Sequence, residues 1–120
     1  RVRPFIKEEL DGSRGDGECK LIVEMPSQTS VIILPPTGIY RGVETALGEK
    51  RSFEFDRVYW SHNQDHPLYA TQQMLHDELG QAMIKQALGG YNNCIFAYGQ
   101  TGSGKSYSVL GGKGDDRGLL

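Results

Sequence analysis

Residues 94–106 read CIFAYGQTGSGKS, and this stretch decides the fold class. Residues 94–98 are a continuous apolar run, bounded by Asn92 and Asn93 on one side and by Gly99 on the other. Such a run is typical of a strand that is buried on both faces of a parallel sheet. Because the run leads into a Gly-rich turn and then a helix start, we expect an α/β protein with ligand chemistry at the carboxyl end of this strand.

The turn at residues 99–106 fits the phosphate-binding pattern G-x-x-x-x-G-K-[ST] at every fixed position. Its glycines permit positive φ and leave no Cβ in the way of phosphate oxygens, so successive backbone N–H groups can converge on one anion. Lys105 is predicted to reach the β and γ phosphates of a nucleoside triphosphate, and Ser106 to offer its hydroxyl to Mg²⁺. A helix that starts near Gly104 would direct unpaired N–H groups at the same oxygens. The alternative is a Gly-rich turn followed by a solvated lysine.

Short β-rich segments are predicted in the first third of the chain. Residues 1–6 alternate polar and apolar side chains like a terminal strand, which Pro4 restricts to an edge or an end. Residues 7–18 are mostly charged or glycine, which indicates a solvated loop. Residues 19–25 and 31–34 are then expected to form a small hairpin.

A strand and a long helix are predicted in the middle of the chain. In residues 52–60, Phe53 and Phe55 alternate with carboxylates, a period of two that predicts a strand with both aromatic side chains in a core. Pro67 lies where the first turn of a helix tolerates proline, and apolar residues then recur at steps of three and four until Gly89 ends the pattern. The recurring residues are Leu75, Leu79, Ala82, Met83 and Ala87.

Composition and charge exclude several classes of protein. A chain of 120 residues with ordinary apolar usage predicts one domain, or one piece of a larger domain. The net charge is −2 and no basic stripe is present, so nucleic acid is not an expected partner. The longest apolar run is about five residues, so we expect no membrane insertion. Cys19 and Cys94 are too few and too far apart to staple a domain, which favours a reducing compartment.

Other polar residues suggest no second site. His62 and His66 have the spacing of metal ligands on a helix, but Pro67 follows them directly, so no regular helix should hold both on one face. Neighbouring carboxylates at residues 8–9 and 77–78 are adjacent rather than facing, unlike the pairs that acid–base hydrolysis needs. The chemistry that the sequence predicts is therefore concentrated at the Gly-rich turn.

Beyond that turn, the sequence resembles the motor domain of kinesins. The run YNNCIFAYGQTGSGKS at residues 91–106 looks like the ATP-binding segment of that family. The related myosin loop normally has Glu-Ser where this chain has Gln-Thr at residues 100–101. Residues 1–4, RVRP, resemble the R-x-R-P adenine-binding strand, and residues 53–56, FEFD, resemble the strand before the family's first long helix. The resemblance covers nearly all of the chain.

The resemblance implies an α/β P-loop NTPase fold with a mixed central sheet. Residues 1–120 would be the amino-terminal part of a kinesin motor domain: the first strand, a hairpin insertion, the long helix, the P-loop strand and the start of the next helix. Residues 58–62 and 69–72 look most like the vesicle-transporting, Unc-104-type class of kinesins.

The resemblance also implies ATP and Mg²⁺ as ligands. The residues that it assigns to the nucleotide are Arg1, Arg3, Pro4, Gly99, Gln100, Thr101, Gly102, Ser103, Gly104, Lys105, Ser106 and Tyr107. Arg1, Arg3 and Pro4 would line the adenine pocket, with Tyr107 on the other face of the ring, where many kinesins have His. A flat base can stack on guanidinium and aromatic planes. The alternatives are a pair of exposed edge-strand cations for the arginines and a helix-packing role for Tyr107.

The implied function is a cytoplasmic ATPase that moves along microtubules and carries cargo or an adaptor through a tail. Kinesins have an N-x-x-S-S-R segment and a D-x-x-G segment with a following Glu, and neither occurs here. Because these segments and the tubulin-binding elements lie later in the family, we expect no catalytic residue within residues 1–120. We also expect little ATPase activity from this polypeptide alone. The alternatives are a non-hydrolysing nucleotide-binding scaffold of motor ancestry and an unrelated P-loop kinase.

Overall fold

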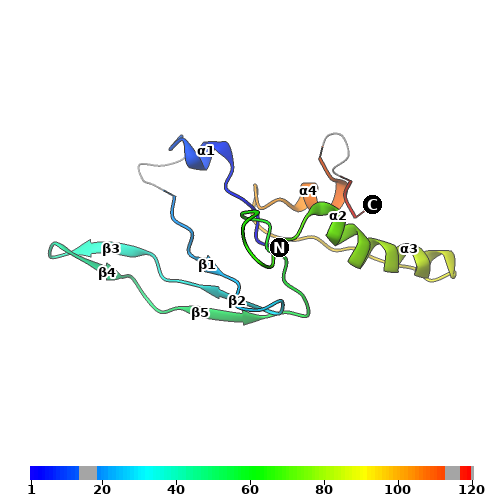
Figure 1. Ribbon diagram of the computed structural model, residues 1–120, viewed down its shortest axis with the longest axis horizontal. Helices are drawn as coiled ribbons and strands as arrows, with labels where there is room; N and C mark the ends of the chain where they lie inside the picture. Colours follow the sequence, from blue (N-terminus) through cyan, green and yellow to red (C-terminus); the bar gives the residue numbers. More distant parts are fainter. Residues whose placement is uncertain (14–18, 113–116, 120) are drawn as a thin grey trace. The chain divides into compact units, whose positions relative to one another are not determined.

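The computed structural model describes residues 1–13, 19–112 and 117–119. They belong to two compact units, Arg1–Leu68 and Tyr69–Leu120. The first unit contains the named strands and one short helix, and the second contains the helices that flank the Gly-rich turn (Figure 1). In the described part of the chain, no helix combines the length and the apolar character needed to cross a bilayer.

A three-stranded antiparallel sheet is the main β structure of the first unit. Its strands, in spatial order, are β1 (Val23–Glu24), β2 (Ser30–Ile33) and β5 (Arg51–Glu54). β1 and β2 confirm the predicted hairpin, and β5 pairs along the whole of β2, with Phe53 opposite Val31.

The predicted strand at residues 52–60 is shorter than expected and its aromatic residues are not buried. β5 ends at Glu54, and Phe53 and Phe55 are 41% and 51% exposed, so the prediction that both fill a core was wrong. A period of two places side chains on one face, but that face is buried only where another layer covers it. The core of this unit comes from residues next to the strands, namely Met25, Val58 and Trp60, with Val2, Val23, Val31 and Leu68 packed against them.

The predicted terminal strand is reduced to one parallel β-bridge, between Val2 and Trp60. The Val2 N–H donates to the carbonyl oxygen of Tyr59 at 2.8 Å, and the Ser61 N–H donates to that of Val2 at 2.8 Å. Pro4 has no N–H to donate, which prevents the same ladder from continuing along the chain.

A short helix, α1 (Lys7–Leu10), replaces part of the solvated loop predicted for residues 7–18. A carboxylate oxygen of Glu9 accepts from the backbone N–H of Ile6 at 3.0 Å, which satisfies one donor at the helix start. The usual sequence pattern for such a start has Ser or Thr at the position of Ile6, so the helix gave no clear signal. Residues 14–18 lie outside the described residues.

A second hairpin, which the sequence did not predict, joins β3 (Thr37–Tyr40) to β4 (Val43–Ala46). Its two central residues, Arg41 and Gly42, have φ of 51° and 78°. Positive φ at both positions is the requirement of the two-residue turn that matches strand twist, and Asn-Gly or Asp-Gly usually fills it. Because the first position is arginine, residue preferences did not predict this turn.

In the second unit, one helix continues from Gln72 to Leu88 and confirms the predicted long helix. It comprises α2 (Gln72–Leu75), a π-helical turn η1 (His76–Gly80) and α3 (Gln81–Leu88). It begins later than Pro67 because the side chain of Thr71 accepts the N–H of Met74 at 3.1 Å and caps the first turn. Leu75 is buried, whereas Leu79 of the predicted apolar face is 38% exposed.

Residues 94–98 are not a strand in the structure, so the prediction of a buried strand was wrong for this segment. Phe96 and Tyr98 are 84% and 83% exposed. Among the described residues, no strand is paired with this segment. A strand is stabilised by hydrogen bonds to neighbouring strands, so an apolar run without such neighbours does not form one.

Candidate nucleotide-binding site

The Gly-rich turn has the backbone that its glycines predict. Gly99, Gly102 and Gly104 have φ of 143°, 82° and 91°, values that residues with a Cβ rarely adopt. Within the turn, the Ser103 N–H donates to the carbonyl oxygen of Gln100 at 3.2 Å. The pattern therefore encodes a defined loop.

Gly99 also lies close to the side chain of Ser103. A Cβ at this position would lie 2.7 Å from the hydroxyl oxygen of Ser103, so that side chain would have to turn away. The loop thus folds back on itself, with the start of the turn against the residue that precedes Gly104.

The ammonium of Lys105 closes the loop. It donates to the carbonyl oxygens of Gly99 at 2.8 Å and Gln100 at 2.9 Å. Two of its three N–H donors are used there and one remains. The sequence assigned Lys105 to phosphate alone, and its bonds to the loop were missed because no residue pattern distinguishes them.

The turn leads directly into α4 (Lys105–Leu110), as predicted. Its N-cap is Gly104, and no side chain caps this end, so the first N–H groups of the helix are available to an acceptor. Their partial positive charge favours an anion at the loop. Across the predicted site, residues 100–102 are exposed and residues 103–105 are half-buried.

Ser106 lies in the first turn of α4 with its side chain exposed. In the described ranges, no three His, Cys, Asp or Glu side chains come together as a metal site. A cation held by one hydroxyl and by phosphate oxygens fits this arrangement, because Mg²⁺ commonly takes few protein ligands and keeps substrate phosphates and waters.

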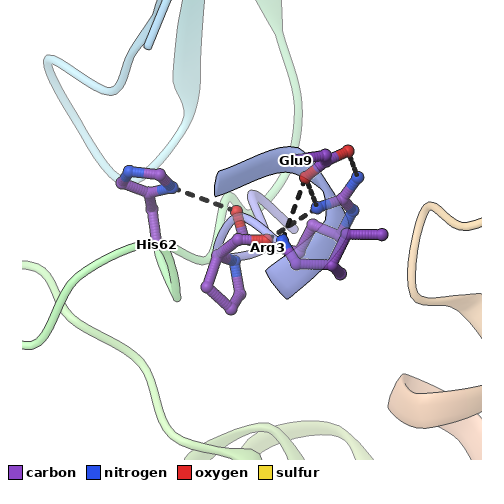
Figure 2. A network of polar contacts seen from close by, with 5 residues as sticks. Arg3, Glu9 and His62 are labelled. Atoms are coloured by element: carbon purple, nitrogen blue, oxygen red, sulfur yellow. Dashed lines mark hydrogen bonds and ion pairs between the residues drawn. The ribbon is translucent and has the colours of Figure 1, made fainter. Parts of the chain in front are cut away.

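Arg3 is fixed by a bidentate ion pair with Glu9 (Figure 2). The two N–O distances are 2.8 and 2.6 Å, and the same guanidinium also donates to the carbonyl oxygen of Pro4 at 2.7 Å. The hydrogen bond with Glu9 raises the pKa of Arg3. His62 Nδ1 lies 3.3 Å from the carbonyl oxygen of Arg3. Arg3 is therefore a rigid cation with an occupied edge, not a freely solvated one.

The other residues predicted for the adenine pocket can be described only within their own units. Arg1 donates from Nε to the hydroxyl of Ser61 at 3.0 Å, and Pro4 is exposed. Tyr107 lies on α4 and is 40% exposed. Arg1, Arg3 and Pro4 belong to the first unit and Tyr107 to the second, so the adenine pocket stays a prediction.

Gln72 is a buried residue that contacts α4, and sequence reasoning missed it. The side chain of Gln72 donates to the carbonyl oxygens of Tyr107 and Ser108 in α4. A glutamine one helical turn before the core residue Leu75 was the available signal, since that spacing places both on one face.

The whole chain, residues 1–120, matches the family model of the kinesin motor domain. The chain belongs to the kinesin motor-domain family. The resemblance to kinesins, which residues 91–106 and 1–4 suggested, is therefore confirmed at the level of the family.

Known kinesins are similar along nearly the whole chain. The kinesin-like protein KIF1A of Rattus norvegicus is 42% identical over 118 residues, which are 98% of this chain and 6% of that protein. The kinesin-like protein unc-104 of Caenorhabditis elegans is 38% identical over 115 residues, which are 96% of this chain and 6% of that protein. These relatives confirm the resemblance to the Unc-104-type class, and the chain spans only a small part of their length.

Solved kinesin structures have the same fold. The KIF14 motor described as bound to ADP in complex with a microtubule superimposes with a TM-score of 0.78 at 33% identity, over 98% of this chain and 28% of that one. A KIF14 dimer with AMP-PNP, also in complex with a microtubule, gives a TM-score of 0.75 at 31% identity. The α/β, kinesin-type P-loop NTPase fold is thereby confirmed.

Proposed function

We propose that residues 1–120 form the ATP-binding part of a microtubule-based motor that hydrolyses ATP to drive movement. One observation carries the proposal. A loop with three positive-φ glycines, closed by Lys105, directly precedes α4, and all residues of this chain, 1–120, match the kinesin motor-domain family. Kinesins of known structure with this fold are described with ADP or AMP-PNP and a microtubule, which supports the same ligands here.

In this proposal the backbone of residues 99–104 binds the phosphates. Its N–H groups and the start of α4 donate to phosphate oxygens, and Lys105 adds a charge-assisted bond from its remaining N–H. Ser106 would hold Mg²⁺ through its hydroxyl oxygen. When bound, the metal ion offsets the negative charge of the triphosphate.

Within the first unit, Arg1, Arg3 and Pro4 would offer the adenine base its binding surface, and a contact of the base with Tyr107 stays the prediction made from the sequence. Glu9 occupies the edge of the Arg3 guanidinium, which leaves the flat face of that group as the surface for stacking. A guanidinium held in one orientation loses less conformational entropy on binding a base than a mobile one.

The partners follow from the same proposal. Microtubules would be bound through regions of the motor outside residues 1–120, and cargo or an adaptor through a tail, in the cytoplasm and on the microtubule cytoskeleton. The net charge of −2 fits an absence of tubulin contacts in this part, because tubulin-facing surfaces must complement an acidic filament.

The function can be tested by the ATPase rate of the full-length protein with and without microtubules. We expect microtubules to stimulate turnover, and Lys105→Ala to lower ATP binding or turnover by about 100-fold or more, because the ammonium closes the loop and would donate to the phosphates. The measurement is steady-state ATPase together with the dissociation constant of Mg-ATP.

Lys85→Ala is the matched control, since Lys85 is an exposed lysine in the last turn of α3. Its kinetics should equal those of the unaltered protein. Full turnover by Lys105→Ala would contradict the assigned site. ATP binding without microtubule stimulation would favour a nucleotide-binding scaffold over a motor.

A further inference from the structure

Gln72 is a buried polar residue whose side chain reaches the helix behind the P-loop. It is 5% exposed and lies in the first turn of α2. Its amide nitrogen donates to the carbonyl oxygen of Tyr107 at 2.9 Å and to that of Ser108 at 3.1 Å. Both hydrogens of one amide group are thus directed at consecutive carbonyl groups of α4.

Those carbonyl groups are in the part of α4 that needs partners from outside the helix. The last four carbonyl groups of an α-helix have no intrahelical donor. The Gly111 N–H donates to the oxygen of Tyr107 at 2.9 Å, and the Leu119 N–H to that of Ser108 at 3.2 Å. Gln72 adds a side-chain donor to each, so it caps the carboxyl end of α4 from another helix.

The helix α4 is short and lies near the surface. None of its residues is buried, and no side chain caps its amino end. Helices as short as Lys105–Leu110 are not stable on propensity alone. The two bonds from Gln72 therefore help to fix this helix to the long helix.

Fixing one end of α4 also fixes the other. The helix has fewer than two turns, and Lys105 and Ser106 are its first two residues. A tilt of its carboxyl end would move the ammonium of Lys105 and the hydroxyl of Ser106 with it. The same amide also restrains the backbone of Tyr107.

We propose that Gln72 is a positioning residue for the P-loop: its amide holds α4 so that Lys105 and Ser106 face the phosphates of the nucleotide. The proposal rests on the proposed function of the loop. Gln72 touches neither nucleotide nor reacting atoms in this role, and acts only through α4.

The test is Gln72→Met in the full-length protein, because methionine keeps the volume of glutamine and removes both donors. We expect the dissociation constant and the KM for ATP to rise about tenfold, because two hydrogen bonds that hold α4 are lost, although each carbonyl oxygen keeps its backbone donor. The rise in Tm that Mg-ATP produces should shrink in parallel, since that rise measures binding to the folded protein.

Gln73→Met is the matched control. Gln73 is the next residue on α2, exposed, and its amide donates to the carboxylate of Asp77 at 2.8 Å rather than to α4. It should leave both the KM and the Mg-ATP-induced rise in Tm unchanged.

Gln72→Glu is a second variant, which places carboxylate oxygens against the two carbonyl oxygens. It should weaken ATP binding more than Gln72→Met does, measured at a temperature where both variants remain folded. A purely structural role predicts something else: Tm falls equally with and without Mg-ATP and the KM stays at its original value, and that result would overturn the proposal. An unaltered protein that binds no ATP would overturn the proposed function as well, so the two failures are distinguishable.

Discussion

Residues 91–98 and 99–110 are neighbours in the chain, yet only the second stretch has the structure that its sequence predicts. The Gly-rich turn and α4 are formed, whereas the apolar run before them forms no strand and is mostly exposed, with Phe96 84% accessible. The difference lies in where the stabilising contacts come from. The turn is closed by Lys105, five and six residues from its acceptors, while a strand needs partners from elsewhere in the sequence.

The largest expected effect in this comparison comes from Gly104→Val, which disrupts the Gly-rich turn, the region whose structure depends on contacts close in sequence. Gly104 has φ of 91° and caps α4, and a β-branched residue is strained there by about 1–3 kcal/mol. We expect ATP binding to weaken by about 100-fold, because the loop must leave the conformation that exposes its N–H groups. Titration of Mg-ATP into the full-length protein measures this, with thermal unfolding alongside.

Gly90→Val separates strain from function. Gly90 has a similar φ of 87°, lies after α3, and a Cβ there would meet no atom within 4 Å. Its variant should lose comparable stability and keep its affinity for ATP. Equal losses of ATP affinity in both variants would show that Gly104→Val acts by lowering the stability of the whole protein rather than by changing the loop.

The parts of the fold that sequence reasoning placed correctly are those with short-range causes. The glycines of the turn, the start of α4 and the long helix all follow from residue preference and helical period. The hairpin around Arg41 and Gly42 was missed because its turn uses an atypical residue at positive φ. The exposure of Phe53 was not predictable, since it depends on whether another layer covers β5.

The site shows the same division. The residues proposed for the P-loop were predicted from the spacing of a single motif, and the positive φ values of its three glycines are ones that glycine adopts without strain. The Arg3–Glu9 pair and the bonds from the Gln72 side chain to backbone carbonyl oxygens of α4 were not, because each depends on the path of the backbone and no residue pattern pairs these groups. A sequence pattern assigns residue types to a site, but not the contacts that orient them.

A smaller effect is expected in the apolar run at residues 94–98, and amide hydrogen exchange of the polypeptide 1–120 would detect it. The amides of residues 94–98 should exchange at rates close to those of an unstructured chain, because no strand in the described part of the structure pairs with them. The amides of Phe55 and Val58 donate to Thr29 and Gln28 at 2.8 and 2.7 Å and should be protected at least about tenfold more.

Mass-spectrometric or NMR exchange at low protein concentration provides the measurement. Protection of residues 94–98 equal to that of Phe55 would mean that this segment has found a partner strand. It would also remove the contrast with the Gly-rich turn.

The smallest expected effect concerns the hairpin β3–β4, which also depends on contacts between near neighbours. The Thr37 hydroxyl donates to the carboxylate of Glu44 at 2.7 Å, and Lys20 lies 3.4 Å from the same oxygen. The bond from Thr37 is the main reason that the pKa of Glu44 is lowered from 4.5. We expect Thr37→Val to move that pKa part of the way back up, because Lys20 remains; an NMR titration of the Glu44 carboxyl measures the change.

The sign of the pH dependence follows from the direction of the shift. The folded chain holds the carboxyl ionised at a lower pH than the unfolded chain, so the bond from Thr37 stabilises the hairpin fully above pH 4.5. That stabilisation is lost as the pH falls through the lowered pKa. Thr45→Val is the control, because the Thr45 hydroxyl donates to the carbonyl oxygen of Val43 in its own strand. If both variants shifted the pKa of Glu44 equally, the bond from Thr37 across the hairpin would not be the cause of the lowered pKa. The hairpin β3–β4 would then no longer be a second example, beside the Gly-rich turn, of structure determined by contacts between near neighbours in sequence.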